Sequence, residues 1–313
     1  NYTGGTKAMA VHAYRILAEL YPKGVFSYLD SNTMEMVFDQ VATRSLRFKV
    51  RPCLSLTQLI KLHGLEWREE APPLRSPIRA DAASFLAQVY SDRELSKCWR
   101  QWCQQELRRH GHNRFSRWQD EWTLSQLPPL SILGLPVALR QFLQEAFGAS
   151  VTALDLKVGL SRGFSRITDF CGWLDGVWLE HYTLAQIQQL VESYPIHESG
   201  LSLHIAHTPG MRGDWDRFEF DVAFVVYYQL FALSCSTAQG RALCKQKLIE
   251  AHTRARQLGG AEARVGLVCV RDDTASLRSE LEEAKRLRNV GVFGRHDLGD
   301  LAQKIGEWVG YSC

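Results

Sequence analysis

The stretch FEFDVAFVVYYQLFALSCST, residues 218–237, contains two apolar runs that predict two neighbouring β-strands. The first run covers residues 218–228 and the second covers residues 229–237, so a hairpin can join them. Glu219 and Asp221 alternate with apolar residues in the first run, which places both carboxylates on one face, about 7 Å apart along the strand. The stretch therefore predicts a buried strand pair with acidic groups on one face.

The segments on either side of this strand pair predict further helices and strands. Upstream, residues 170–194 predict a long helix that carries Glu180 in its first turns. Downstream, the pattern predicts helices over residues 242–260, 276–288 and 297–309, and strands over residues 263–270 and 289–294. This order of elements describes an α/β domain, with a mixed sheet that helices cover on both faces.

The carboxylates of this region are candidates for a metal site. Glu180, from the preceding helix, can reach the strand face that carries Glu219 and Asp221. Carboxylates that converge without a matching cation suit a hard divalent metal such as magnesium or manganese. Such a site would support hydrolysis of a phosphodiester. The spacing alone favours a structural interpretation, in which Glu219 faces solvent on an edge strand and Asp221 pairs with an arginine.

The first ten residues, NYTGGTKAMA, place a glycine-rich turn at the start of a predicted helix. The glycines let the backbone approach a ligand closely, and the free N–H groups of the helix offer partial positive charge. A turn of this kind suits a phosphate or another anionic edge of a nucleotide, and a simple helix cap is an equally good interpretation. The candidate ligand-binding residues are Thr3, Gly4, Gly5, Thr6 and Lys7.

Two predicted strands, residues 24–31 and 34–39, follow this first helix. A helix with a glycine-rich turn at its start, followed by strands, suits one half of an open α/β nucleotide-binding sheet. We therefore expect residues 1–52 to be the back part of such a domain, whose front part would precede Asn1.

The middle of the chain, residues 53–160, predicts a mostly helical connector. Aromatic and basic side chains alternate there, and together such groups can bind a nucleic-acid strand. Acidic residues lie among them, which favours a helical connector with a solvated charged face. The aromatic and basic residues are Trp99, Trp102, Trp118, Trp122, Lys97, Arg100, Arg108, Arg109, Arg114 and Arg117.

Composition narrows the class of protein further. The 313 residues carry a formal net charge of only +3, so no global basic field indicates nucleic acid. No apolar run reaches the roughly 18 residues that a membrane span requires. The eight cysteines are scattered and form no CxxC pair, which is typical of free thiols in a reducing cytosol. We therefore expect a cytoplasmic protein without a membrane partner.

The motifs, taken in order, resemble those of the CRISPR ancillary endonucleases, which join a CARF sensor domain to a PD-(D/E)xK nuclease domain. The matching motifs are NYTGGTKAM, GVWLE, FEFDV, LSCST and ARQLGG…ARVGLV. The resemblance covers nearly the whole chain. It implies a partial Rossmann-like CARF domain over residues 1–52, a connector over residues 53–160 that is winged-helix-like in some relatives, and a restriction-endonuclease-like domain over residues 161–313.

The resemblance also implies a function. It implies a homodimer of type III CRISPR antiviral defence that binds cyclic oligoadenylate, with cyclic tetra-adenylate as the expected messenger, at the turn of residues 3–7. The nuclease domain would then cut DNA or RNA with manganese or magnesium. Glu180 and Asp221 match the carboxylate positions of the family and would hold the metal, with Glu219 beside them.

One departure from the family concerns the second strand, where an acidic residue and a lysine are usual. This sequence has Ser234 and Ser236 at those positions. Lys245 or Lys247, on the next predicted helix, is the alternative source of the lysine. Three interpretations stay open: a metal-dependent endonuclease, intact or impaired; a catalytically inactive cyclic-nucleotide sensor that binds nucleic acid or holds the dimer together; and, favoured least, a nucleotide-binding transcription regulator.

Overall fold

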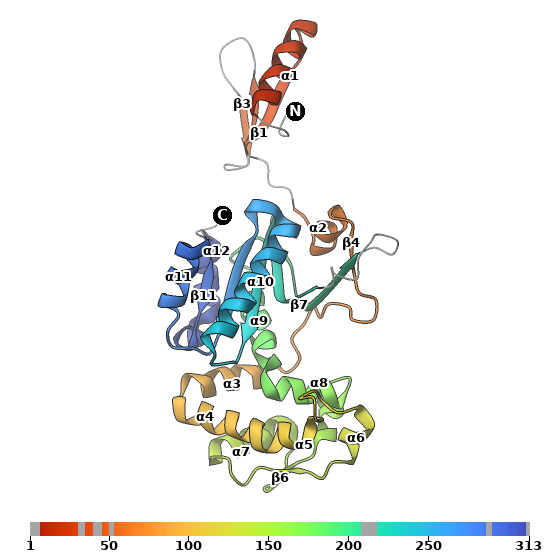
Figure 1. The fold of residues 1–313 in the computed structure, drawn as a ribbon, viewed down its shortest axis with the longest axis vertical. Coiled ribbons are helices and arrows are strands. Elements are labelled where there is room, and N and C mark those ends of the chain that lie inside the picture. The colour runs from red at the N-terminus through yellow and green to blue at the C-terminus, as the bar shows by residue number, and fades with distance from the viewer. Residues whose placement is uncertain are drawn as a thin grey trace. The chain divides into compact units, whose positions relative to one another are not determined.

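The structure is a computed structural model, and it describes residues 7–30, 35–39, 46–49, 53–207, 218–285 and 290–310. The chain divides into two compact units, which are residues 1–53 and residues 54–313 (Figure 1).

The first unit is a helix followed by a three-stranded antiparallel sheet in the order β1-β2-β3. The ring of Tyr14 meets the ring of Phe26 edge-on, with 5.1 Å between centroids, and so joins helix and sheet. The helix and the first two strands confirm the sequence prediction, which did not include β3. The elements are α1 (Lys7–Leu20), β1 (Phe26–Asp30), β2 (Glu35–Asp39) and β3 (Leu46–Lys49).

The second unit contains a mixed six-stranded sheet in the order β11-β10-β9-β8-β7-β4. β9, β10 and β11 are parallel to one another, whereas β4, β7, β8 and β9 pair antiparallel. The predicted hairpin and mixed sheet are thereby confirmed. The strands are β4 (Leu65–Trp67), β7 (Ile196–His207), β8 (Phe218–Val226), β9 (Gln229–Ser236), β10 (Arg264–Cys269) and β11 (Gly291–Phe293).

Helices cover both faces of this sheet (Figure 1). Successive side chains of a strand point to opposite faces, and β8 carries apolar side chains on both, so each face needs a cover. Ala223 and Val225 of β8 pack with residues of α2, α10 and α11, whereas Val222 and Phe224 pack with residues of α9 and α12. The helices are α2 (Leu56–Leu62), α9 (Trp178–Gln188), α10 (Arg241–Gly259), α11 (Ala275–Lys285) and α12 (Leu301–Gly310).

Residues 80–177 form a mostly helical part that shares a hydrophobic core with the α9 face of the sheet (Figure 1). Trp99 and Trp173 are fully buried in that core. Trp99 is therefore a packing residue and is not available to a nucleic-acid strand. The elements are α3 (Ala80–Ser91), α4 (Arg93–Trp102), η1 (Cys103–Arg108), α5 (Arg109–Gly111), α6 (Glu121–Gln126), β5 (Leu130–Ser131), α7 (Val137–Phe147), β6 (Ala153–Leu154), η2 (Leu156–Arg162), α8 (Ile167–Gly172) and η3 (Trp173–Val177).

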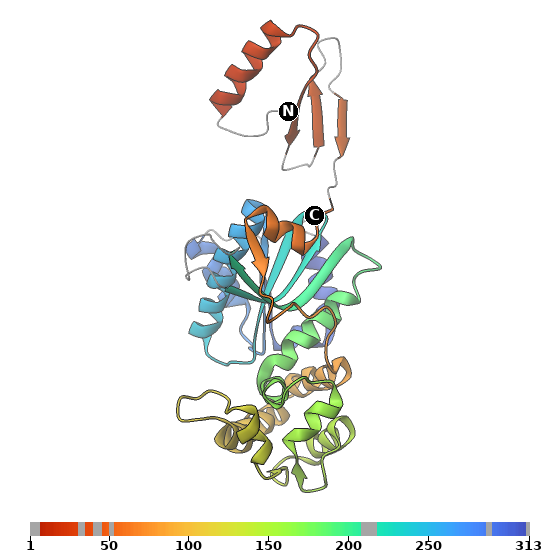
Figure 2. The ribbon, with the colours of Figure 1, turned by 90° about the vertical axis from the view of Figure 1, so that its right-hand side faces the viewer.

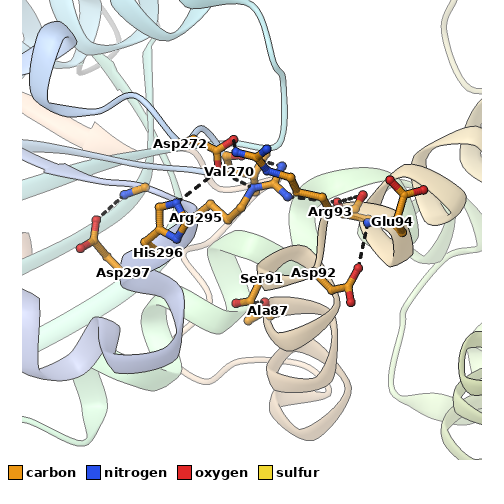
Figure 3. Close-up of polar contacts among 12 residues, drawn as sticks. Ala87, Ser91, Asp92, Arg93, Glu94, Val270, Asp272, Arg295, His296 and Asp297 are labelled. Carbon is orange, nitrogen blue, oxygen red and sulfur yellow. Dashed lines mark hydrogen bonds and ion pairs between the residues drawn. The ribbon is translucent and has the colours of Figure 1, made fainter.

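A polar network fastens the helical part to the end of β10 (Figure 3). Asp272 accepts from Arg93 of α4, with 3.1 Å between Oδ2 and Nη2, and forms an ion pair with Arg295, with 3.0 Å between Oδ1 and Nε. Arg295, in η6 (Arg295–Asp300), is only 4% exposed. Asp272 thus supplies the partner charge that the buried guanidinium needs and links α4 to the end of β10.

Two strands of the sheet were not predicted from the sequence. β7 contains the polar segment His197–Gly200 and an irregularity in its pairing between Ile196 and Glu198, which together hide the alternation of its apolar residues. β4 lies within the range predicted as connector, although it pairs with β7 at the edge of the sheet. Both strands depend on pairing with β8 or β7, and not on a strong local pattern.

The structure also bears on two expectations from the sequence, which concern membrane-spanning helices and disulfides. Among the described residues, no helix is both long and apolar enough to cross a lipid bilayer. The cysteines that the structure describes are free thiols, as the sequence pattern predicts: Cys53, Cys98, Cys103, Cys171, Cys235, Cys244 and Cys269.

Candidate active site

A polar cleft of about 190 Å³ lies between the β8–β9 hairpin and α10. Strand residues form its floor and one side of α10 forms its wall. The register of the hairpin, in which Val222 faces Leu233, sets Asp221 beside Ser234. The residues that line the cleft are Glu219, Phe220, Asp221, Leu233, Ser234, Lys247, Glu250 and Ala251.

Asp221 is held firmly at the floor of the cleft. Its Oδ2 accepts hydrogen bonds from the Ser234 hydroxyl at 3.0 Å and from the Cys235 backbone N–H at 2.7 Å. The same oxygen lies 3.5 Å from the ammonium nitrogen of Lys247. Three donors on one carboxylate oxygen fix the orientation of the group, which prepares it to act on a bound partner.

The structure distinguishes the two candidate lysines. Lys247 enters the cleft, where its ammonium also donates to the Cys235 carbonyl at 2.9 Å. Burial is the largest single effect and disfavours its charge, but the negative charges around it, that of Asp221 foremost, and the hydrogen bond to Asp221 together raise the pKa of Lys247. Lys245 instead contacts Glu280 on α11. Lys247 is therefore the lysine that the fold brings to Asp221, and Lys245 is not.

Glu180 and Glu219 add negative charge beside Asp221. Burial raises the pKa of Glu180 well above its usual range, and the charges of Asp221 and Glu219 raise it further. Burial also raises the pKa of Glu219, although His204, whose Nδ1 lies 3.6 Å from its Oε2, favours the charged form. Asp221 and Glu219 therefore add to the effect of burial in disfavouring a negative charge on Glu180.

Carboxylate oxygens such as those of Asp221 and Glu180 are the ligand type that a hard divalent cation prefers. Asp221 and Glu180 are the residues that would hold it. No cluster of three or more His, Cys, Asp or Glu side chains suited to a metal ion occurs within the described part of the chain. Two carboxylates, completed by water, would thus form a weaker site than a three-ligand cluster.

The two serines of β9 contribute no charge to the cleft. Ser234 is 7% exposed and donates its hydroxyl hydrogen bond to Asp221. Ser236 is 6% exposed, and its hydroxyl accepts from the Ala238 N–H at 3.3 Å. Ser234 therefore supports the orientation of Asp221, whereas Ser236 supports the local backbone.

The predicted ligand-binding turn of the first unit is not placed by the structure. Thr3, Gly4, Gly5 and Thr6 lie outside the described residues. Lys7 begins α1, and its side chain likewise lies outside the described part. The assignment of these five residues to a ligand stays a prediction.

Sequence reasoning missed two charged or titratable residues of the site. Glu250 lines the cleft because it follows Lys247 by three positions on α10 and so lies on the same helix face. That spacing is a signal that could have identified Glu250. His204 reaches Glu219 because β7 pairs with β8, and no local pattern indicated that strand.

We expect Glu180→Gln to stabilise the protein above the usual carboxyl pKa of about 4.3. The pKa of Glu180 is raised in the folded state, so ionisation of this group destabilises the fold. The protein keeps its full stability below the unfolded-state pKa, where Glu180 is neutral, and loses stability as the pH rises through the folded-state pKa. The neutral amide should raise the free energy of unfolding by about 1 kcal/mol at neutral pH and leave it unchanged near pH 4.

Thermal unfolding measured at several pH values tests this expectation. The exposed Glu192→Gln change is the matched control, since it removes the same charge from the surface. Parallel stability curves for wild type and Glu180→Gln across the whole pH range would contradict it.

The comparisons with known proteins concern the fold. No protein-family model and no curated protein matches the chain. The crystal structure of protein VC1899 from Vibrio cholerae matches with a TM-score of 0.69 and 16% identity, over 100% of this chain and 75% of that one. Can2 from Sulfobacillus thermosulfidooxidans, solved in complex with cyclic tetra-adenylate, matches with a TM-score of 0.64 and 17% identity, over 99% of this chain and 76% of that one. The predicted fold is thereby confirmed: this chain folds like VC1899 and Can2 along its whole length.

Proposed function

We propose that the protein is a cyclic-oligoadenylate-responsive effector of type III CRISPR antiviral defence, and that it is a metal-dependent endonuclease acting on DNA or RNA in the cytosol. The fold supports this proposal, because it is shared with a protein that was solved with cyclic tetra-adenylate bound. The motifs of the sequence support it independently.

The observation that carries the nuclease assignment is the meeting of Asp221 and Lys247 in the cleft. Asp221 and Glu180 would hold manganese or magnesium. A bound divalent cation supplies a Lewis acid and lowers the pKa of a water molecule. Lys247 provides positive charge where the phosphodiester transition state gathers negative charge. In this way α10 supplies the lysine that β9 lacks at position 236.

The sensor assignment places the messenger at Thr3, Gly4, Gly5, Thr6 and Lys7 of the first unit. Cyclic tetra-adenylate has several phosphates, which suit a glycine-rich turn with a following helix N-terminus and a lysine. We propose a homodimer, because a ring of repeated units suits two equal halves of a binding site.

The second candidate is a catalytically inactive sensor that binds nucleic acid or holds an assembly together. The neutral hydroxyls of Ser234 and Ser236 favour it, because they stand where a metal ligand and a lysine are usual in the family that the sequence resembles. In this case the Asp221–Lys247 pair would be a structural ion pair at the floor of the cleft.

Cleavage of labelled DNA and RNA, single-stranded and double-stranded, by the full-length protein tests the proposal. We expect products only when manganese and cyclic tetra-adenylate are both present. Messenger binding without any cleavage would favour the inactive sensor. Cleavage that does not respond to any cyclic oligoadenylate would overturn the sensor assignment, and the absence of both binding and cleavage would overturn the proposal as a whole.

A further inference from the structure

A short hairpin, residues 111–119, projects from the helical part between α5 and α6 (Figure 2). The backbone N–H of Asn113 donates to the Arg117 carbonyl at 2.8 Å, and that of Gln119 donates to the Gly111 carbonyl at 2.9 Å. His112 and Trp118 face each other between these bonds, with 4.2 Å between ring centroids. The base of the hairpin is thus closed by both backbone pairing and ring packing.

The tip of the hairpin is ordered by a single side chain. Asn113 Oδ1 accepts from the backbone N–H of Phe115 at 2.9 Å and of Arg117 at 3.2 Å. Ser116 has a φ of 57°, a left-handed conformation that is unfavourable for a residue other than glycine. The hairpin holds this strained residue in place, which indicates that the tip has one defined conformation before a ligand binds.

The side chains at the tip are an aromatic ring and two cations. Phe115 is 68% exposed, and the guanidinium of Arg114 lies 4.6 Å from the centroid of its ring. Arg114 and Arg117 are both exposed, and neither has an ion-pair partner among the described residues. An exposed phenyl ring that is flanked by unpaired arginines suits a ligand with flat faces and negative charge.

We propose that this hairpin binds a nucleic-acid strand, with Phe115 stacked on an unpaired base and with Arg114 and Arg117 on neighbouring phosphates. Every base has a π-face, so stacking of this kind is independent of sequence. The partner is the substrate class of the proposed function, on which the inference rests. The inference gives a binding role to a part of the connector for which the sequence pattern favoured only a solvated charged face.

A second cavity, of about 320 Å³, lies between the helical part and the end of β9, and it is lined among others by Arg100 and by Arg108 with its ion-pair partner Asp175. Thr237, in the same cavity, follows Ser234 by three residues, or about 10 Å along an extended chain. The hairpin projects on the side of the sheet that carries α10 (Figure 2).

Equilibrium binding of labelled single-stranded DNA and RNA, followed by fluorescence anisotropy in the presence of EDTA, tests the inference without any cleavage. We expect Phe115→Ala to weaken binding about tenfold at every salt concentration, and Phe115→Trp to restore it. The double change Arg114→Ala/Arg117→Ala should lower the slope of log affinity against log salt by about 1.4, at about 0.7 per phosphate contact.

Matched controls separate the hairpin from general charge. The double change Lys157→Ala/Arg162→Ala removes the same charge from exposed positions of the same helical part, and Val151→Ala removes an apolar side chain that is 71% exposed. If the protein cleaves nucleic acid but the hairpin variants bind it as well as the controls do, the inference is overturned and the proposed function stays intact. Selective loss of binding in a protein that does not cleave would support the inference and contradict the nuclease assignment.

Discussion

Replacing Asp221 by asparagine should lower the rate of nucleic-acid cleavage at least about 10³-fold, because several kcal/mol of transition-state stabilisation depend on a cation at this carboxylate. Asparagine keeps an oxygen that can accept from Ser234 and from the Cys235 N–H, so the hairpin should stay folded. The change removes the negative charge alone.

Two readouts make this prediction specific. Manganese should raise the melting temperature of the wild type and should no longer raise that of Asp221→Asn, because a ligand stabilises the folded state only if it binds there. The surface change Glu192→Gln, which removes the same charge, should behave like wild type in both assays. Full cleavage by Asp221→Asn would exclude Asp221 as the anchor of the metal.

Replacing Lys247 by alanine should lower the cleavage rate about 10²–10³-fold, which is the usual effect of removing one group that stabilises transition-state charge. The ammonium of Lys247 lies 3.5 Å from Asp221 and is kept charged by it. Lys245→Ala is the matched control, since Lys245 lies on the same helix but contacts Glu280 and not the cleft. It should cleave at close to the wild-type rate.

The pair of lysine variants decides whether Lys247 serves the cleavage reaction or only a structural ion pair. A strong loss in Lys247→Ala with an intact Lys245→Ala means that α10 provides the lysine of the active site. Equal rates in both variants, together with measurable wild-type cleavage, would assign Lys247 to a structural ion pair. Metal-dependent melting shifts show whether Lys247→Ala still folds and binds manganese.

The strands of the hairpin and the elements after it were predictable from the sequence, because their patterns are local. Alternating apolar residues predict β8 and β9, and the same alternation predicts that Glu219 and Asp221 share a face. Both residues do line one cleft. β7 was not predictable in this way, because its polar segment and its pairing irregularity interrupt the pattern that a regular strand would show.

Which lysine serves the cleft was decided only by the tertiary structure. Lys245 and Lys247 are two residues apart on one helix, so their side chains point about 200° apart around its axis. The sequence by itself determined only that the two lysines would point in nearly opposite directions. The packing of α10 against β9 and α11 decided that Lys247 meets Asp221, a residue 26 positions earlier, because such a contact depends on how helix and sheet are rotated against each other.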